Sequence, residues 1–361
     1  MANIVSIATA VPNFCHQQED ILQFMSSFYG VDETEKRKLS FLYKHSDIEK
    51  RYSVIDDFGR AADEWDFIPQ GNAMPIPSIE DRMRIYNQEA PALSIRAITD
   101  CIEGYISADE ITHLITVSCT GMSAPGLDLQ VAEAMGLAPN IFRTSVNFMG
   151  CYAAVHALKL AKLICDSTPN ANVVIVATEL CTIHFQNEYT VDNVASSLLF
   201  ADGCAAALIS NTIQKSDSLA LKGFYSQVQY KGKKEMAWEL SSKGFLMTLS
   251  GYIPHLVEQD ISTLVDNALK HYGLQKQQIT QWCIHPGGKK ILDVIEKQLQ
   301  LGKDDLCRSR KVLSQYGNMS SPTILFVLKE FMQSKKIDNS NIFGVAFGPG
   351  LTMETFITGR P

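Results

Sequence analysis

Long apolar runs, a surplus of positive charge and paired cysteines are all missing from this 361-residue sequence. No window approaches 18 uninterrupted apolar residues, which argues against a membrane-spanning helix. The opening segment, MANIVSIATAVPN, lacks the basic stretch and long apolar run of an export signal, so we expect a cytoplasmic protein. The net charge of -7 argues against a general affinity for nucleic acid or for anionic membranes.

Nine cysteines are present, but their number is odd and no two form a Cys-x-x-Cys motif. Cys181 and His184 are spaced like two metal ligands, yet no second pair of ligands accompanies them. We therefore predict neither disulfides nor a bound metal ion. Four other cysteines lie in apolar stretches typical of reduced thiols in a core: Cys101, Cys165, Cys204 and Cys283.

Short apolar runs alternate with longer stretches of helical periodicity, which indicates an α/β fold. The composition, 46% apolar and 20% charged, is sufficient for one large domain or two ordinary ones. A polar stretch with several prolines, from about Asp56 to Glu89, is predicted to be irregular. The predicted strands are Leu114–Ser118, Val173–Thr178, Ala205–Ile209, Trp282–His285, Phe343–Phe347 and Thr355–Thr358. The clearest helices are Tyr152–Cys165, Ile261–His271, Ile291–Leu299 and Thr323–Gln333.

Two segments of the chain share a pattern of small-residue turn, amphipathic helix and buried strand. When Cys151 is aligned with Ser320, the following strands begin at the same offset, at Val173 and Ile342. The pattern is compatible with an internal duplication, although any two β-α-β units share part of it.

Cys151 lies in the segment NFMGCYAAVHAL, directly after a glycine and before a run with helical periodicity. Glycine allows a sharp turn and the close approach of a ligand to the backbone. The helix that follows directs its free N–H groups and the positive end of its dipole towards the sulfur, which favours the nucleophilic thiolate. Since a single cysteine beside a helix start usually belongs to the core, Cys151 needs partners to be a candidate nucleophile.

His285 and Asn318 are the candidate partners. His285 ends the apolar strand of WCIHPGGKKILDVI, and a glycine-rich turn follows, so its side chain can face a ligand. Asn318 lies in the small, polar turn of SQYGNMSSPTILF, before a helix. Each also has a structural interpretation, as a histidine satisfied in the core or an asparagine that caps a turn. Papain-like proteases use the same three residue types, so these types alone do not decide the chemistry.

The local sequences resemble the thiolase superfamily, and specifically the type III polyketide synthases, the chalcone-synthase-like family. The matching segments keep the family's order and spacing from about Ile111 to Thr358, while CTGMSAPGLDLQ and IEKRY extend the resemblance towards the N-terminus. The resemblance implies a five-layered αβαβα thiolase fold built from two similar halves, at 1–212 and 213–361, and a homodimer. The segments are NFMGC, LLFADGCAAALI, IHPGGKKILD, YGNMSSPTILFVL and FGPGLTMET.

The resemblance assigns roles to the three candidate residues. Cys151 matches the nucleophile that accepts the starter acyl group and the growing chain. His285 and Asn318 match the pair that binds the thioester carbonyl of malonyl-CoA and assists its decarboxylation. Donors to such an oxyanion contribute roughly 3–4 kcal/mol each in comparable sites. Because decarboxylation creates the carbanion, no strong base is needed, which explains a site without a catalytic carboxylate and disfavours a protease.

Pocket and CoA sites follow from the same resemblance. Phe200 matches a gatekeeper between the CoA tunnel and the reaction cavity, and Ser320 matches a residue that lines that cavity. For each of the basic residues Lys44, Lys50 and Arg51, the alternative interpretation is a position on an ordinary solvated helix face. Other positions implied are Gly348, Pro349 and Gly350 in the loop that shapes the cyclisation cavity; Cys181, Ile183 and His184 in the starter pocket; and Lys44, Lys50 and Arg51 at the CoA diphosphate.

Several positions depart from the plant members of the family. Met247 replaces a second gatekeeper phenylalanine, which suggests a more adaptable cavity. Ala346 replaces a loop glycine, Trp238 a small residue, and Ala124 a methionine that reaches the partner subunit. These features are similar to bacterial and fungal members, many of which accept fatty acyl starters. We therefore expect a fatty acyl-CoA starter, malonyl-CoA extension and an alkylpyrone, alkylresorcinol or related polyketide, without a metal or redox cofactor.

Four other functions compete with this interpretation. A β-ketoacyl synthase III would condense once, but it usually has asparagine where Pro286 follows His285, and it lacks the FGPG turn. A hydroxymethylglutaryl-CoA synthase would need a glutamate base ahead of Cys151, and no residue is an obvious match. A non-catalytic subunit of a condensing heterodimer is disfavoured because all three catalytic residue types are present. A cysteine hydrolase would turn over acyl-CoA without malonyl-CoA.

Overall fold

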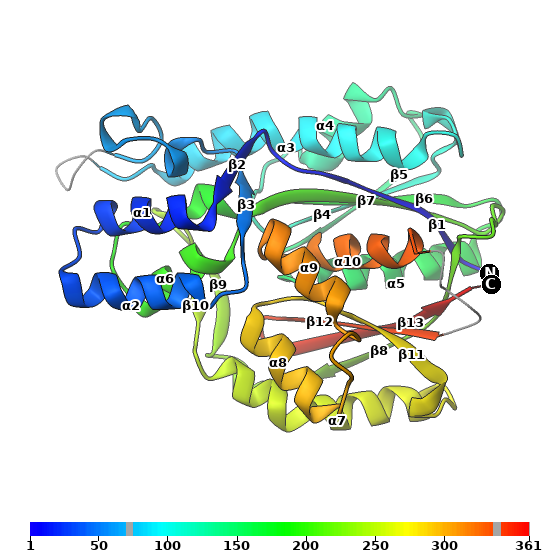
Figure 1. The fold of residues 1–361 in the computed structure, drawn as a ribbon. Coiled ribbons are helices and arrows are strands. Elements are labelled where there is room, and N and C mark those ends of the chain that lie inside the picture. Colours follow the sequence, from blue (N-terminus) through cyan, green and yellow to red (C-terminus); the bar gives the residue numbers. More distant parts are fainter. Residues whose placement is uncertain (70–74, 335–340, 361) are drawn as a thin grey trace.

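The computed structural model describes residues 1–69, 75–334 and 341–360 (Figure 1). Its main sheet has nine strands in the order β11-β12-β13-β8-β1-β7-β6-β4-β5. These strands are β1 (Asn3–Ala10), β4 (His113–Ser118), β5 (Phe142–Asn147), β6 (Asn172–Leu180), β7 (Asp202–Ser210), β8 (Leu219–Val228), β11 (Ile279–Ile284), β12 (Asn341–Gly348) and β13 (Thr352–Gly359). Two small ribbons pair β2 (Phe14–Gln17) with β3 (Lys50–Ser53), and β9 (Met236–Ser241) with β10 (Gly244–Leu249).

The two ends of this sheet repeat one connectivity. In the first half, β6 pairs parallel with β4 and antiparallel with β7, which pairs antiparallel with β1. In the second half, β12 pairs parallel with β11 and antiparallel with β13, which pairs antiparallel with β8. The halves meet where β1 and β8 pair antiparallel. The prediction of two similar halves is therefore confirmed.

Helices lie between the two halves of the sheet and on their outer faces. Figure 1 shows layers of helices alternating with layers of strands. Apolar residues cover most of the central helix α10 and the inner side of α5, as expected for helices packed between two sheet halves. Helices α3 and α4 cover the outer face of the first half, and α7 and α8 cover that of the second. The helices are α1 (Gln18–Phe28), α2 (Glu33–Lys44), α3 (Ile79–Ile102), α4 (Leu127–Ala134), α5 (Ala153–Ser167), α6 (Val191–Leu199), α7 (Ile253–His271), α8 (Lys289–Gln298), α9 (Cys307–Tyr316) and α10 (Thr323–Met332).

The stretch expected to be irregular, from about Asp56 to Glu89, is only partly so. Residues 70–74 lie outside the described residues, and short 3-10 turns precede them. From Ile79 onward the prediction is wrong, because α3 begins there. A capping box explains the start: the Ser78 side chain accepts from the N–H of Asp81, while the Asp81 carboxylate accepts from Ser78 N–H at 3.1 Å.

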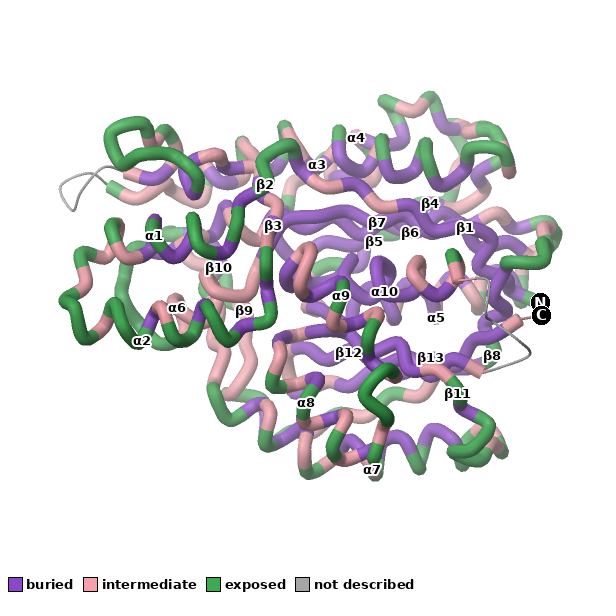
Figure 2. Tube along the Cα trace, viewed as in Figure 1, coloured by how far each residue is buried: buried purple, intermediate pink, exposed green. Residues whose placement is uncertain are grey.

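The remaining structural predictions agree with the observed elements. The ends of every predicted strand and helix agree with those of an observed one to within three residues, except that α7 begins eight residues earlier than predicted. All nine cysteines are free thiols. Within the described ranges, no helix is both long and apolar enough to cross a membrane. Figure 2 shows that the strands of the main sheet and the central helices are mostly buried, with exposed residues on the outer helices.

Candidate active site

Cys151 lies in the turn that leads from β5 into α5. Gly150 precedes it with φ +83°, and a Cβ at Gly150 would approach the Cδ of Pro349 to 2.3 Å. Glycine is therefore required where the two halves of the molecule touch. The side chain of Cys151 is buried, but it lines a cavity of about 910 Å³. That volume lies at the upper end of the usual range for small-molecule sites.

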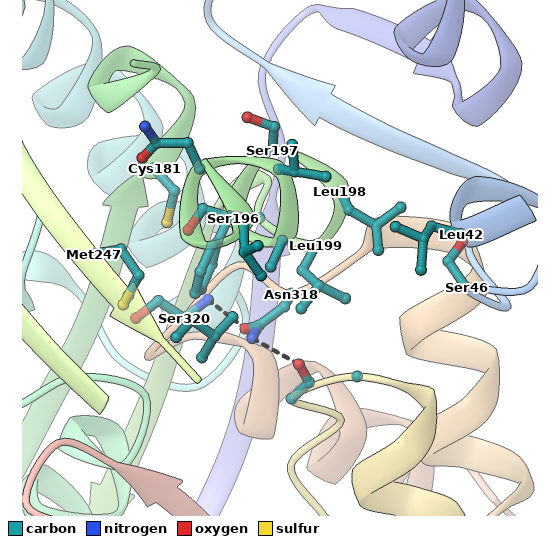
Figure 3. A pocket seen from close by; sticks show the side chains of 18 of the residues that line it. Leu42, Ser46, Cys181, Ser196, Ser197, Leu198, Leu199, Met247, Asn318 and Ser320 are labelled. Atoms are coloured by element: carbon teal, nitrogen blue, oxygen red, sulfur yellow. Dashed lines mark hydrogen bonds between the residues drawn. The ribbon is translucent and has the colours of Figure 1, made fainter. Parts of the chain in front are cut away.

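The same cavity contains His285 and Asn318, which come from the other half of the chain. Asn318 is held by its backbone, since its N–H donates to Leu199 O at 2.9 Å and its carbonyl accepts from Ala201 N–H at 3.0 Å. Its side-chain Oδ1 accepts from Ser320 N–H at 2.9 Å, and its Nδ2 donates to Gly287 O at 3.3 Å (Figure 3). These bonds fix the amide, whose side chain also hydrogen-bonds to the sulfur of Cys151 in the cavity.

His285 follows the last residue of β11, and its backbone N–H donates to Val345 O at 2.9 Å. The side chain is 1% exposed, and both ring nitrogens lack a hydrogen-bond partner among the described residues. Burial lowers the pKa of His285 to about 3, so the ring is neutral. A buried polar group left unpaired costs about 1–3 kcal/mol. The energetically plausible partner of His285 is a ligand in the cavity.

Two effects oppose each other at the sulfur of Cys151. Burial, aided by the charge of Glu179, raises its pKa to about 11. Hydrogen bonds from Ser320, Asn318 and the backbone N–H of Cys151 lower it. Burial dominates, so the isolated group is a thiol, whereas the sequence favoured a thiolate. Transfer of its proton to His285 would convert two neutral groups into an ion pair, whose mutual attraction offsets part of the cost of burying the two charges.

Glu179 is a buried carboxylate near the centre of the molecule. It accepts hydrogen bonds from Cys119 N–H and Thr120 Oγ1, both at 2.8 Å, and from Ser321 Oγ at 2.6 Å. Burial nevertheless raises its pKa to about 7. Since Ser321 belongs to the second half and the other donors to the first, Glu179 ties together the two walls of the cavity.

His184, Trp238 and Phe245 form one wall. Phe245 N–H donates to His184 Nδ1 at 3.1 Å, so Nε2 carries the proton that is donated to Thr120 O at 2.8 Å. The His184 ring stacks on Phe245 at 4.3 Å and meets Trp238 edge-on at 5.6 Å. Trp238 Nε1 donates to the carbonyl of Cys119 at 2.6 Å. This satisfied aromatic cluster closes the cavity on its side.

Comparison with known proteins identifies the scaffold that carries this cavity. The family model for the N-terminal domain of chalcone and stilbene synthases matches residues 1–212, and the model for their C-terminal domain matches residues 224–359. The chain belongs to this family, the type III polyketide synthases. The predicted family and acyltransferase class are therefore confirmed.

Individual relatives extend the likeness over the whole synthase. This chain is 29% identical over 361 residues to the alpha-pyrone synthesis polyketide synthase-like Pks18 of Mycobacterium tuberculosis. The match covers 98% of this chain and 90% of Pks18. The crystal structure of PKS-I from the brown alga Ectocarpus siliculosus matches with a TM-score of 0.90 at 27% identity, covering 100% of this chain and 98% of that one. The C-terminal type III domain of Steely1 from Dictyostelium matches with a TM-score of 0.88 at 25% identity, covering 99% of each chain. The predicted thiolase-like fold is confirmed.

The structure brings most of the predicted pocket residues of the synthase to the cavity, but not all. Ile183 does not line it, because its side chain is buried in the core beneath α3. Gly348 and Gly350 also lie off the cavity; a Cβ at Gly348 would meet the ring of Tyr152 at 2.5 Å. Those that do line it are Phe200, Cys181, His184, Met247, Ser320 and Pro349.

The structure separates the three predicted CoA cations from one another. Lys44 and Lys50 do not line the cavity: Lys44 is exposed at the end of α2, and Lys50 lies over the ring of Tyr52 at 6.0 Å. Arg51 does line it, but its guanidinium is buried and donates to Gln18 Oε1 at 2.9 Å and to Phe200 O. Arg51 therefore holds the backbone beside the gatekeeper position.

Three other lysines line the cavity where it reaches the surface. Lys38 pairs with Glu35 at 2.6 Å, and Lys289 pairs with Asp47 at 2.7 Å. Within the described residues, Lys290 has no ion-pair partner. Lys289 and Lys290 begin α8, directly after the glycine turn that follows His285. Proximity to that turn could have indicated them from the sequence.

Proposed function

We propose that this type III polyketide synthase condenses malonyl-CoA repeatedly onto an acyl-CoA starter carried by Cys151. One observation carries the proposal: a buried histidine with two unpartnered nitrogens and an asparagine whose amide is held beside the sulfur share one cavity with a cysteine. The cysteine supplies a nucleophile, and the other two supply donors for a developing oxyanion.

Loading of the starter is a thioester exchange. The Cys151 sulfur attacks the acyl carbonyl as its proton passes to His285. The carbon–sulfur bond to CoA then breaks, and the imidazolium returns the proton to the CoA thiolate. The acyl group is left on Cys151 at little cost in free energy, since one thioester replaces another. Proton transfer within the pair avoids a lone charge in a buried site.

Extension begins when malonyl-CoA loses its carboxylate as CO2. The electrons of the broken carbon–carbon bond form an enolate, whose oxygen accepts hydrogen bonds from His285 and from Asn318 Nδ2. The enolate carbon attacks the thioester on Cys151, and the released thiolate can accept the lengthened chain again. Neutral His285 suits this role, because its pKa of about 3 keeps it a donor without a charge of its own. No metal or redox cofactor takes part in these steps.

The lysines at the mouth are suited to the phosphates of CoA. Lys290 is exposed and unpaired within the described ranges, while Lys38 and Lys289 can exchange their carboxylate partners for phosphate. We propose these three, in place of Lys44, Lys50 and Arg51, as the CoA-binding cations.

A fatty acyl starter and a pyrone-type product fit the cavity best. The surface that lines it is mostly apolar, and Pks18 is named for alpha-pyrone synthesis. The closed wall of His184, Trp238 and Phe245 limits growth of the polyketide on one side. An alkylpyrone, alkylresorcinol or related ring is therefore the proposed product.

A homodimer is proposed from the edge of the sheet. Within the described residues β5 pairs only with β4, and all of its residues except Val146 are exposed. Phe142 on this strand is 70% exposed. An unprotected edge strand is a template for pairing with another chain, so light scattering during gel filtration should give twice the chain mass of 40.0 kDa.

Product analysis tests the proposed reaction. The enzyme is incubated with carbon-13 malonyl-CoA and acyl-CoA starters of graded length, and products are identified by mass spectrometry. We expect cyclised products with more than one malonyl-derived unit. A single β-ketoacyl product for every starter would instead support a β-ketoacyl synthase III-like reaction, and no malonyl carbon with any starter would refute both.

A further inference from the structure

Helix α2 carries large apolar side chains on the face that points away from the protein. Its buried residues are Leu39 and Tyr43, which lie one turn apart on the inner face. Phe41 lies between them in sequence and therefore roughly opposite to both, and its side chain is 62% exposed. Its ring stacks on that of His45 at 4.1 Å instead of turning inward. Leu42 is exposed as well, so the packing of α2 gives no reason for these two residues to be apolar.

Two further apolar side chains are exposed beside α2, where the chain enters α6. Val191 is 80% exposed, and Tyr189 is exposed too. The Tyr189 hydroxyl donates to Glu35 Oε2 at 3.0 Å, which holds this segment against α2. All four apolar residues line the cavity, so they mark its opening, and Figure 3 shows Leu42 at the end away from Met247. We call these four the mouth patch: Phe41, Leu42, Tyr189 and Val191.

The free charges around the mouth patch are positive. Arg37 and Lys44 lie one turn before and one turn after Phe41, and neither has an ion-pair partner among the described residues. The net charge of -7 therefore does not describe this face. The nearby carboxylates are engaged within the protein: Glu33 with Lys36 at 3.9 Å, Glu35 with Lys38 at 2.6 Å, Asp47 with Lys289 at 2.7 Å, Glu188 with Lys243 at 3.0 Å, and Asp192 with Leu249 N–H at 3.3 Å.

The position and size of the mouth patch favour a lipid surface over a protein partner. Figure 1 shows α1 and α2 side by side at one end of the molecule, beyond the main sheet, and Figure 2 shows exposed residues along α2. Four side chains are far fewer than the about 20–30 residues a side of a stable protein interface. A bilayer surface needs only a few apolar side chains at headgroup depth, with cations beside them for anionic lipids.

The proposed starter gives such a surface a use. A fatty acyl-CoA is an amphiphile, whose chain favours the interior of a bilayer while its CoA part stays in water. With the mouth patch at headgroup depth, the opening of the cavity faces the lipids. Because the surface that lines the cavity is mostly apolar, the chain passes from one apolar environment into another with little exposure to water.

We propose that the mouth patch, together with Arg37 and Lys44, docks on a bilayer that contains anionic lipids, and that the synthase takes long-chain acyl-CoA from it. The proposal rests on the acyl-CoA condensation proposed above and adds the place from which the starter arrives. Phe41 and Val191 enter the headgroup region, while the two cations pair with lipid phosphates. Each cation should strengthen partitioning roughly fivefold at low salt, and less as salt screens the charges.

Flotation with vesicles tests the docking directly. The full chain is mixed with vesicles of phosphatidylcholine, alone or with about 30% phosphatidylglycerol, and bound protein is measured after centrifugation. We expect binding to the anionic vesicles that weakens as salt increases. Arg37→Glu combined with Lys44→Glu should lower this binding at least about 25-fold, because two attractive charges become repulsive. Phe41→Ser should lower it at least about fivefold, through the loss of one inserted ring.

Matched substitutions at other exposed positions provide the controls. Leu240→Ser removes an apolar side chain of similar exposure to Phe41 from β9, outside the cavity. Lys303→Glu reverses an exposed charge in the loop before α9. Both controls should bind vesicles like the wild type. If the wild type does not bind anionic vesicles, or if the mouth-patch variants bind as tightly as these controls, the proposed docking is wrong.

Activity separates docking from the reaction itself. For Phe41→Ser, kcat/KM for palmitoyl-CoA carried in anionic vesicles should fall at least about fivefold, whereas kcat/KM for butyryl-CoA in solution should stay within about twofold of the wild type. An equal loss with both starters would show that Phe41 acts on CoA and would overturn the proposal. If the wild type floats with anionic vesicles but incorporates malonyl carbon with no starter, docking is supported while the proposed condensation fails.

Discussion

The two halves of the molecule share one topology but supply different chemistry to one cavity. Before α5, the first half places Cys151; at the matching turn before α10, the second half places Ser320, which has φ +60°. The second half adds His285 and Asn318 at its own strand end and turn. In the proposed function, the repeated scaffold supplies an acyl carrier from one half and an oxyanion site from the other. The following substitutions test this division, from the largest expected effect to the smallest.

Replacing the nucleophile should distinguish the chemistry of the two halves most clearly. Cys151→Ala removes the atom that carries the acyl chain, so polyketide formation should fall by at least about 10⁴-fold. Carbon dioxide release from malonyl-CoA should persist, because His285 and Asn318 remain. Product chromatography together with CO2 trapping measures both. Product formation near the wild-type rate would overturn the role of Cys151.

Removing the histidine should have the opposite effect, with decarboxylation slowed and loading of the acyl group on Cys151 retained. His285→Ala takes away an oxyanion donor, and malonyl-CoA decarboxylation should slow by about 10²–10³-fold. His255→Ala, on the exposed face of α7, is the matched control and should not change the rate. If His285→Ala decarboxylates as fast as this control, the histidine does not stabilise the enolate.

Changing the asparagine should have a somewhat smaller effect. Asn318→Ala loses one donor while the backbone bonds to Leu199 and Ala201 remain, so decarboxylation should slow by about 10²-fold. Asn318→Asp should be slower still, since a carboxylate would repel the enolate oxygen. Single-turnover CO2 release measures both variants, and equal rates for Asp and Asn would contradict donation by Nδ2.

The smallest effect is expected at the position that matches Cys151 in the second half. The Ser320 hydroxyl lowers the pKa of Cys151, so Ser320→Ala should raise it. Below its pKa, a thiol has a thiolate fraction that falls tenfold for each unit by which the pKa rises. Alkylation by iodoacetamide at pH 8 should therefore slow by roughly tenfold. A faster or unchanged rate would show that Ser320 does not bond to the sulfur.

The predictable part of this site is the part that lies next to a strand end or a small-residue turn. Cys151, His285 and Asn318 each follow such a local pattern, and the topology that brings them together came from the family resemblance. Glu179 was missed, although it is the single charged residue in the apolar strand VVIVATEL. An isolated acid at that position was a usable signal of a buried network.

Predictions failed where the orientation of a side chain or the packing of several elements decides the outcome. Lys44 was assigned to CoA, but its position on α2 leaves it off the cavity, while Lys38 reaches it from the same helix. Ile183 and His184 are adjacent, yet only the latter lines the cavity. Helix α6 has no buried residue, and no local pattern encodes its incomplete packing.

The separation of acyl loading from decarboxylation can be measured in one paired experiment. Cys151→Ala and His285→Ala are each mixed with malonyl-CoA labelled in its free carboxyl group and with an acyl-CoA starter. Released CO2 and the intact protein mass are then recorded. We predict CO2 without a protein adduct for Cys151→Ala, and an acyl adduct with at least about 10²-fold less CO2 for His285→Ala. An adduct on Cys151→Ala, or wild-type CO2 release by His285→Ala, would contradict the division of chemistry between the two halves.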